Sequence, residues 1–304
     1  MKPSGWMLTM LLMAGPVWAL EPWQSPYEQD HPLVGAILDT QSGERLSAEQ
    51  LYQRLSGHPL VLVGEKHDNP DHHALERALY QALSPQSAPR TLVLEMLSGG
   101  ALLKPNPGLS ELDDTALQVA IEWPQGSWPW QDYAELVRLA LANGSALGAA
   151  NLTRPTIRAV YEQGADALDS ASQRATMAAI EPRVREPWAE VLYEQHCGAL
   201  PMAHMTPMVK VQVARDAAMA GVLAQTEGPA LLISGGFHAA QRDAVPAHLR
   251  ERGLDSVSVL LLEVDSEHQD WREYREAIEA DFHYLWFTPK STTRDYCDDL
   301  AGTH

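Results

Sequence analysis

Short, continuous apolar runs recur along the chain and constrain its fold more than any other feature. Four of them are LVLVGE (60–65), TLVLEM (91–96), ALLISGG (230–236) and SVSVLLLEV (256–264). Strands that read as unbroken apolar runs are buried on both faces, as in parallel sheets whose crossover helices cover both sides. We therefore expect an α/β protein with a largely parallel sheet and crossover helices.

Helix signals lie between these runs. Ser47 and Gln50 form a capping box, which predicts a helix after Ser47. Asn69 followed by Pro70 supplies an N-cap and a first helical residue, and the helical pattern then continues to about Leu83. The order of run, turn and helix supports crossover connections between parallel strands.

The remaining elements follow from the same patterns. Shorter strands are expected at 34–40 and 146–151, and a further helix from about His238. A mostly helical insertion, at about 156–226, interrupts the alternation of strands and helices. The sequence therefore predicts one sheet with an added helical block.

The first nineteen residues have the pattern of a secretory signal peptide. Lys2 precedes an apolar run from Trp6 to Met13, and a small-x-small site ends at Ala19. That run is shorter than the roughly 20 residues that cross a bilayer. No cysteine lies near the cut to accept a lipid, so we expect a soluble periplasmic protein with a single domain at 20–304.

Charge and cysteine usage limit the possible partners. The chain has 40 acidic and 22 basic residues and a formal net charge of -18, which disfavours nucleic acid. Its two cysteines, Cys197 and Cys297, are too far apart for a CxxC motif. An oxidising compartment would allow them to pair, and a disulfide and two separate thiols are equally compatible with the sequence.

Polar side chains stand at or just after the ends of four predicted strands. These are Glu65 with His67, Glu95, His238, and Asn151 with Arg154. Ligands of open parallel sheets bind beyond the carboxyl ends of the strands, where such groups converge. Convergent acids and histidines are what a metal site or a proton-transfer site requires.

Two of these strand ends share one motif. Gly64-Glu65-Lys66-His67 and Gly235-Gly236-Phe237-His238 both place a histidine three residues after a glycine that lets the backbone turn. One such histidine alone would more often be structural, but two copies favour a functional site. Glu65, His67 and His238 are accordingly the predicted ligands of a divalent metal.

Several other polar residues remain open between structure and function. His72 and His73 lie in the first turn of a predicted helix, where either a structural role or contact with a bound ligand is possible. Gln212 and Asp216 interrupt a methionine stripe at helical spacing. Inside such a stripe they require buried partners or a polar cavity.

The segment EWPQGSWPWQDYAEL (122–136) is rich in aromatic residues. Its tryptophans could line a large planar ligand, with the hydroxyl of Tyr133 as a polar group or iron ligand. A loop packed on the core is the alternative, and composition alone favours that alternative.

Five segments in order, spread from about residue 60 to 250, resemble one known family. They read GEKHDNPDHHALERAL, LVLEML, WPWQDYAELVRLALANGSALGAANLTR, VQVARDAAMA and LLISGGFHAAQRDAVPAHL. The chain is similar to the ChaN-like haem-binding family of bacterial iron-uptake proteins. That family lies in the Tiki superfamily, which also contains metal-dependent proteases and erythromycin esterases.

The resemblance implies a non-enzymatic protein that binds haem between two subunits and works with the haem-uptake machinery of the cell envelope. A tyrosine would bind the iron, with Tyr133 as first choice and Tyr193 as second, and a histidine of the partner subunit would contact a propionate. The predicted cofactor-binding residues are Tyr133, Tyr193, His72, His73, Asn151, Arg154 and Gln212.

The superfamily also implies a competing function. In its hydrolase branches the two histidine motifs and a strand-end glutamate form the active site, which here would be His67, His238 and Glu95. A histidine would act as general base or metal ligand on an ester or amide. Arg154 would stabilise the developing oxyanion.

Overall fold

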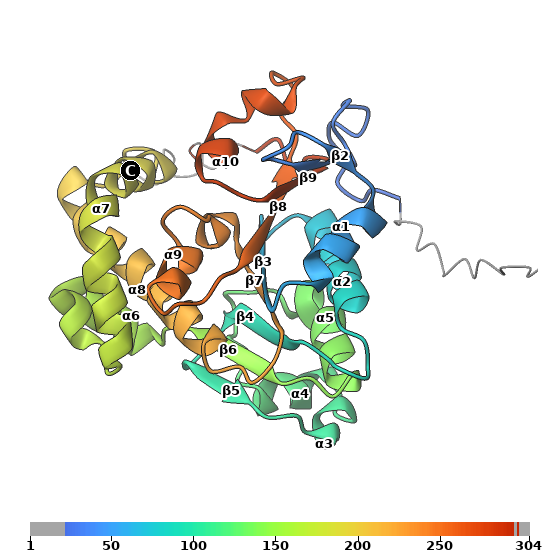
Figure 1. The fold of residues 1–304 in the computed structure, drawn as a ribbon. Coiled ribbons are helices and arrows are strands. Elements are labelled where there is room, and N and C mark those ends of the chain that lie inside the picture. The colour runs from blue at the N-terminus through green and yellow to red at the C-terminus, as the bar shows by residue number, and fades with distance from the viewer. Residues whose placement is uncertain (1–21, 295–296, 298–304) are drawn as a thin grey trace, which may run out of the picture.

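The computed structural model describes residues 22–294 and residue 297, and this part of the chain forms one nine-stranded sheet (Figure 1). In sheet order the strands are β2 (Arg45–Leu46), β1 (Ile37–Asp39), β9 (Tyr284–Thr288), β8 (Val257–Glu263), β3 (Leu60–Glu65), β7 (Ala230–Gly235), β4 (Thr91–Ser98), β6 (Leu147–Asn151) and β5 (Ala101–Leu103). The six strands from β9 to β6 are parallel, and the pairs at the two edges are antiparallel. The predicted largely parallel α/β sheet is confirmed.

Helices cover both faces of the sheet (Figure 1). The α-helices are α1 (Ala48–Ser56), α2 (Pro70–Leu83), α3 (Pro107–Ser110), α4 (Asp114–Ala120), α5 (Trp130–Ala142), α6 (Arg154–Gln163), α7 (Ala171–Gln195), α8 (Met205–Leu223), α9 (Val245–Arg250) and α10 (Arg275–Glu279). Short 3-10 turns are η1 (Gly164–Ala167), η2 (Met202–His204), η3 (Gly236–Ala239) and η4 (Trp271–Glu273). Helices α1, α2 and α5 pack on one face, and α8 and α9 on the other.

The strands bury alternate side chains in two separate cores. Val61 and Val63 of β3 belong to the core beneath α1, α2 and α5. Leu60 and Leu62 belong to the core beneath α8 and α9. Because successive side chains of a strand point to opposite faces, a strand covered on both sides must be apolar throughout. This explains the unbroken apolar runs in the sequence.

The predicted helix starts are present. The Ser47 hydroxyl accepts a hydrogen bond from the Gln50 amide, and the Gln50 side chain accepts one from the Ser47 amide. Asn69 caps α2 by accepting bonds from the amides of Asp71 and His72. Each bond satisfies an amide that the first turn of a helix leaves unpaired.

The predicted helical insertion is also confirmed, as α6, α7 and α8 with the turns between them. These helices have an apolar core of their own, which includes Val160, Ile180 and Val209. A disulfide joins Cys197, just after α7, to Cys297, with the two Cα atoms 5.5 Å apart. The sequence left this pairing open, and the structure contains it.

Two predicted element boundaries were wrong, and one strand was not predicted. The first strand is limited to Ile37–Asp39 and lies antiparallel near the sheet edge. The strand Tyr284–Thr288, which fits between β1 and β8, was not predicted. His238 lies in the 3-10 turn η3, and the helix begins only at Val245, where Pro246 occupies the first helical turn.

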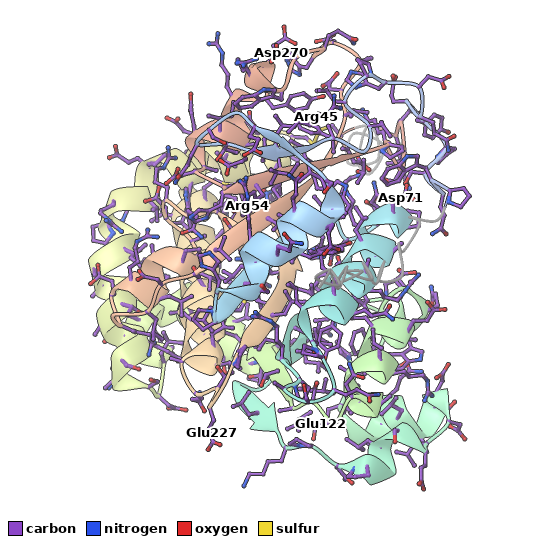
Figure 2. The ribbon with its side chains drawn as sticks, turned by 45° about the vertical axis from the view of Figure 1, so that its right-hand side comes forward. Arg45, Arg54, Asp71, Glu122, Glu227 and Asp270 are labelled. Carbon is purple, nitrogen blue, oxygen red and sulfur yellow. A yellow bond between two sulfur atoms is a disulfide. The ribbon has the colours of Figure 1, made fainter. Side chains whose placement is uncertain are left out.

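Polar contacts attach the segment before β1 to this framework. The carboxylate of Asp71, which is labelled at the start of α2 in Figure 2, accepts hydrogen bonds of 2.8 and 2.9 Å from the amides of Gln24 and Ser25. Arg54 of α1, also labelled in Figure 2, pairs with Asp39 and Glu44, each at 2.6 Å. Among the described residues, no helix is long and apolar enough to cross a membrane. The predicted signal peptide, 1–19, lies outside the described residues.

Candidate functional site

The carboxyl ends of β3, β7 and β4 bring the two histidine motifs together. His67 Nδ1 lies 2.9 Å from Glu65 Oε1, and His67 Nε2 lies 4.0 Å from Glu95 Oε2. His238 Nε2 lies 3.5 Å from the other oxygen of Glu95. The predicted convergence of strand-end polar groups is therefore present in this part of the fold, and we call these four residues the strand-end cluster.

Glycines allow the two histidine motifs at the strand ends to approach so closely. A Cβ atom on Gly235 would lie 2.9 Å from His67 Nε2, and one on Gly64 would lie 2.8 Å from the Cα of Gly236. Both distances are shorter than non-bonded atoms tolerate. The glycines of the two motifs are thus required by the close packing of the two strand ends, rather than by a left-handed backbone.

Glu65 is the centre of a buried polar network. Its Oε1 accepts a 2.7 Å hydrogen bond from the Tyr133 hydroxyl, and its Oε2 lies 3.2 Å from His73 Nε2. Burial acts to raise the pKa of Glu65, but His67 and His73 outweigh it and hold that pKa well below its usual range. Glu65 is therefore ionised at neutral pH. Burial and the negative charge of Glu65 raise the pKa of Glu76 well above normal.

His238 is held from its other side by Asp216 of α8. Its Nδ1 lies 2.6 Å from Asp216 Oδ1, and both residues are buried. Burial raises the pKa of Asp216 to about 6 despite the attraction of His238. Within the described part of the chain, the second oxygen of Asp216 and the Oε1 of Gln212 are buried without hydrogen-bond partners. Of the two polar residues in the methionine stripe of α8, Asp216 thus has a buried partner in His238, whereas the Gln212 oxygen has none there.

Positive and negative groups alternate through the strand-end cluster. Burial acts to lower the pKa of both histidines, but Glu65 and Glu95 raise that of His67, and Glu95 and Asp216 raise that of His238. The same histidines lower the pKa of Glu95 against its burial. The result is a chain of ion-paired acids and histidines, which can hold and pass protons.

The described residues contain no group of three or more His, Cys, Asp or Glu side chains placed to hold a metal ion. Glu65 and His67 are close, but His238 contacts Glu95 and Asp216 instead. The predicted metal ligands Glu65, His67 and His238 are therefore neighbours without forming a metal site in this arrangement.

Tyr133, the first choice as iron ligand, is fully buried. Burial, and then the charges of Glu65 and Glu76, raise its pKa far above normal, and its hydroxyl is already used as a donor. An iron-binding tyrosine must be reachable and must lose its proton. In this structure the buried position disfavours Tyr133 as the iron ligand. Tyr193, the second choice, is half-buried near the end of α7.

Three further residues predicted to contact a ligand have partners within the protein. His72 is buried, and its two ring nitrogens contact the Lys66 amide and the Thr288 hydroxyl. His73 is buried against the Tyr133 ring. Asn151 bonds the backbone of Glu95 and of Leu152. A ligand at any of these side chains would have to displace the contacts that they make in this structure.

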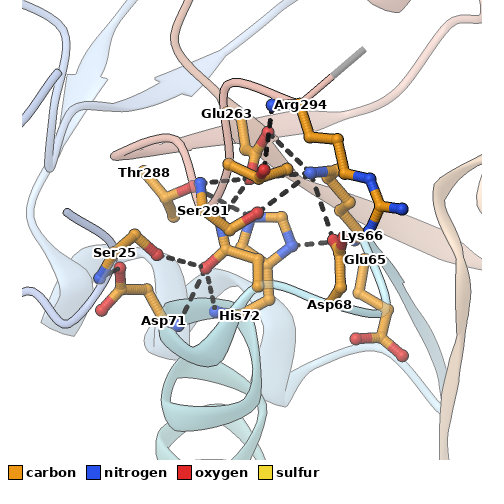
Figure 3. Close-up of polar contacts among 12 residues, drawn as sticks. Ser25, Glu65, Lys66, Asp68, Asp71, His72, Glu263, Thr288, Ser291 and Arg294 are labelled. Atoms are coloured by element: carbon orange, nitrogen blue, oxygen red, sulfur yellow. Dashed lines mark hydrogen bonds and ion pairs between the residues drawn. The ribbon is translucent and has the colours of Figure 1, made fainter. Parts of the chain in front are cut away.

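The loop after β3 has a structural role, which Figure 3 shows. Lys66 Nζ lies 3.1 Å from Asp68 and 3.2 Å from Glu263 of β8. Asn69 and Ser291 also donate hydrogen bonds to Glu263. The segment between β3 and α2 thus joins the start of α2 to the ends of β8 and β9.

A second polar region lies on the surface of α6, and of its residues only Arg154 was predicted from the sequence. Arg154 and Arg158, both exposed, line a pocket of about 410 Å³ together with Glu162. The hydroxyl of the half-buried Tyr161 lies 3.0 Å from Nδ1 of the exposed His204 in η2. Helical spacing was the available signal, since residues 154, 158 and 161 lie on neighbouring turns of one face. We call Arg154, Arg158, Tyr161 and His204 the α6 surface.

Comparison with known proteins agrees with this fold. A family described as "Haem-binding uptake, Tiki superfamily, ChaN" matches residues 51–249. A solved structure titled "Cofacial heme binding to ChaN of Campylobacter jejuni" is 22% identical, covers 82% of this chain and 95% of its own, and superposes with a TM-score of 0.66. No curated protein matches the chain. The family match covers most of the sheet and the whole helical insertion, and the chain belongs to the ChaN family of haem-binding uptake proteins in the Tiki superfamily.

Proposed function

We propose that this protein binds haem on the α6 surface for bacterial haem uptake, with Tyr161 as the iron ligand. The observation that carries the proposal is Tyr161, a half-buried residue whose hydroxyl is exposed and contacts an exposed histidine. Phenolate oxygen is an established axial ligand of haem iron. Family membership supports haem as the ligand.

The surroundings of Tyr161 suit the other parts of a haem. Arg154 and Arg158 line the adjacent pocket and offer guanidinium groups to the two propionates. Leu200 and Met202, close to His204 in the chain, are 40% and 46% exposed and offer apolar contact to the porphyrin. Apolar side chains exposed beside cationic ones are what a planar ligand with two carboxylates requires.

The wider setting follows from the same proposal. A haem on an open surface buries one of its faces, so a second copy of the chain would cover the other face and form a homodimer. Export to the periplasm and transfer of haem to or from envelope proteins complete the proposed role. These steps are supported by the family match and by the signal pattern in the sequence.

Hemin titration of tyrosine variants tests the proposal. The native protein should give a Soret band with a tyrosinate charge-transfer band, and size-exclusion chromatography should show a dimer on loading. Tyr161→Phe should lose the tyrosinate band, whereas Tyr193→Phe and Tyr133→Phe should keep it. If Tyr193→Phe alone loses the band, the ligand is Tyr193, and if native protein binds no hemin at micromolar concentration the proposal fails.

Hydrolysis at the strand-end cluster is the second candidate function. The observation that favours it is the geometry of His238, whose Nδ1 is held at 2.6 Å by Asp216 while its Nε2 faces Glu95. A carboxylate that holds one ring nitrogen leaves the other to move a proton. His67, whose side chain is 34% exposed and packs against Trp128, connects this site to solvent.

A panel of esters and peptides tests this candidate. Activity in native protein that disappears in His238→Asn would support hydrolysis, because asparagine keeps a polar group but moves no proton. Arg154 donates a hydrogen bond to Ser127, which precedes Trp128, and the Trp128 ring packs against His67, so the oxyanion role of Arg154 stays a prediction. Equal rates in native protein and His238→Asn would remove the candidate.

A further inference from the structure

Three polar atoms between α7 and the end of α9 have no hydrogen-bond partner among the described residues. They are Nε2 of His248, a fully buried residue of α9, and Nε and Nη2 of Arg252, and all three are out of contact with solvent. Arg252 follows His248 by four residues, one turn further along the chain, so the two side chains are neighbours. Since buried polar groups are almost always hydrogen-bonded, three such atoms in one place indicate a bound partner.

The neighbours of His248 fix which ring nitrogen carries its proton. Nδ1 lies 2.8 Å from Oγ1 of Thr176 in α7, and that hydroxyl donates its own proton to the carbonyl oxygen of Gln173. Nδ1 is therefore the donor, which leaves Nε2 as an acceptor. Burial, and then the charges of Arg252 and Arg183, lower the pKa of His248 to about 3, so the ring is neutral at neutral pH. The unpaired Nε2 thus requires a hydrogen-bond donor.

The guanidinium of Arg252 has the opposite requirement. Its Nη1 donates a 3.0 Å hydrogen bond to the hydroxyl of Ser172, an exposed residue in the first turn of α7. Its other edge, Nε with Nη2, is a pair of donors that suits two oxygens of one oxyanion. Burial lowers the pKa of Arg252, and within the described chain no nearby acid counteracts this effect. The unpaired edge thus requires an anion with two acceptor oxygens.

We propose that Arg252 and His248 bind one inorganic phosphate ion as its monoanion. Two oxygens of the ion accept hydrogen bonds from Nε and Nη2 of Arg252, and an acidic hydroxyl of the same ion donates to Nε2 of His248. One negative charge matches the single charge of the guanidinium, as a buried ion requires. Because the three protein atoms are out of contact with solvent, the ligand is a small ion rather than an ester with an organic group.

The local charges favour an anion, although the whole chain has a formal net charge of -18. Arg252 contacts the first turn of α7, and the positive end of the dipole of this helix adds to the guanidinium charge. Arg183, exposed on the same helix, is close enough for its charge to act on His248. This phosphate site shares no residue with the α6 surface or with the strand-end cluster.

Isothermal titration calorimetry at mildly acidic pH, with inorganic phosphate and sulfate as probes, tests the proposal. Sulfate has the same tetrahedral shape but carries no proton under these conditions, so it would turn a bare oxygen toward Nε2 of His248. Native protein should bind one phosphate per chain. It should bind sulfate about a hundredfold more weakly, because a buried acceptor that loses its donor is costly.

Three variants separate the two contributions. Arg252→Gln should abolish phosphate binding, whereas Arg45→Gln, which removes an exposed cation from β2, should leave it unchanged. His248→Asn should bind phosphate and sulfate with similar affinity, because the asparagine amide keeps a donor for Thr176 but has no acceptor in place of Nε2. Circular dichroism checks the fold of each variant. If His248→Asn does not fold, the ratio of phosphate to sulfate affinity in native protein and the Arg252→Gln result decide.

The outcomes that would overturn the proposal are distinct. Absence of phosphate binding by native protein at millimolar concentration would overturn it, since water would then be the partner of the three atoms. Equal affinities of native protein for phosphate and sulfate would overturn the role of His248. Unchanged phosphate binding by Arg252→Gln would overturn the site. None of these measurements uses hemin, so their failure is distinguishable from failure of the proposed haem-binding function.

Discussion

Tyr133 and Tyr161 each make one hydrogen bond through the hydroxyl group, but in opposite environments. Tyr133 is fully buried and donates to the ionised Glu65 at 2.7 Å. Tyr161 lies at the surface and contacts the imidazole of His204 at 3.0 Å. Both have polar partners and nearby aromatic or apolar side chains. Only the second can be reached by a ligand from solvent.

The partner decides what each tyrosine can become. A phenolate at position 133 would place a second negative charge beside Glu65 in a buried site, which is strongly unfavourable. A phenolate at position 161 would lie at the surface beside the imidazole of His204 rather than beside a carboxylate. The difference favours Tyr161 over Tyr133 as the proposed iron ligand, because exposure and the charge of the hydrogen-bond partner decide whether a phenolate can form.

Removing the centre of the buried network should have the largest effect. Glu65→Ala leaves His67 and His73 without their carboxylate and leaves the Tyr133 hydroxyl without its acceptor. Breaking a buried ion pair from one side costs about 3–5 kcal/mol. Urea unfolding followed by circular dichroism should show a loss of that size in the free energy of unfolding.

A matched variant at the other site sharpens this result. His204→Ala also removes a histidine contact but at an exposed position, and it should change the free energy of unfolding by less than about 0.5 kcal/mol. A loss as large as that of Glu65→Ala would mean that the α6 surface is a structural site.

The two tyrosine-to-phenylalanine variants should have opposite effects on stability and on hemin affinity. Tyr133→Phe leaves a buried carboxylate short of one donor and should cost about 1–3 kcal/mol of stability while hemin affinity is kept. Tyr161→Phe should lower hemin affinity about a hundredfold with little change in stability. Denaturant unfolding and hemin titration of both proteins measure the two effects. Lower stability of Tyr161→Phe together with lower hemin affinity of Tyr133→Phe would contradict the comparison.

Charge reversal on α6 should have a smaller effect. Arg158→Glu replaces an exposed cation of the pocket by an anion and should weaken hemin binding about tenfold, or about 1.4 kcal/mol. Arg45→Glu, a charge reversal of the same size on β2, is the control and should leave hemin affinity unchanged. Equal weakening by both variants would point to net charge rather than to a propionate site.

The smallest effect is a change in the acid dependence of stability. The pKa of Glu65 is lower in the folded protein than in the unfolded chain, so its stabilisation is present above the unfolded pKa and is lost as pH falls toward the folded pKa. Between pH 5 and pH 4 this carboxylate should account for about 0.5 kcal/mol of lost stability. Urea unfolding of native protein and Glu65→Gln at both pH values checks this, because the variant should lose correspondingly less.

Much of the fold was predictable because its signals are local. Runs such as LVLVGE report burial on both faces, and the caps at Ser47 and Asn69 satisfy amides within one turn. The strand Tyr284–Thr288 was missed because its aromatic residues do not distinguish a strand from an apolar loop. Its place between β1 and β8 depends on contacts far apart in sequence.

The strand-end cluster was predictable for a different reason. Parallel strands share one carboxyl edge, so Glu65, Glu95 and His238 had to lie near one another once the sheet was assigned. The depth of Tyr133 was not predictable, because burial depends on how α5 packs against α2. The partnership of Tyr161 with His204 needs two helices of the insertion to meet, and no local pattern specifies such a meeting.

The disulfide between Cys197 and Cys297 has a consequence for the unfolded chain. The two cysteines are 100 residues apart in the sequence, and the loop between them contains α8, β7, β8 and β9. A cross-link that closes a loop of this length removes conformational entropy from the unfolded state, by about 4–5 kcal/mol in the chain-entropy model. The bond therefore keeps the helical insertion and the last strands of the sheet tethered even when the chain is unfolded.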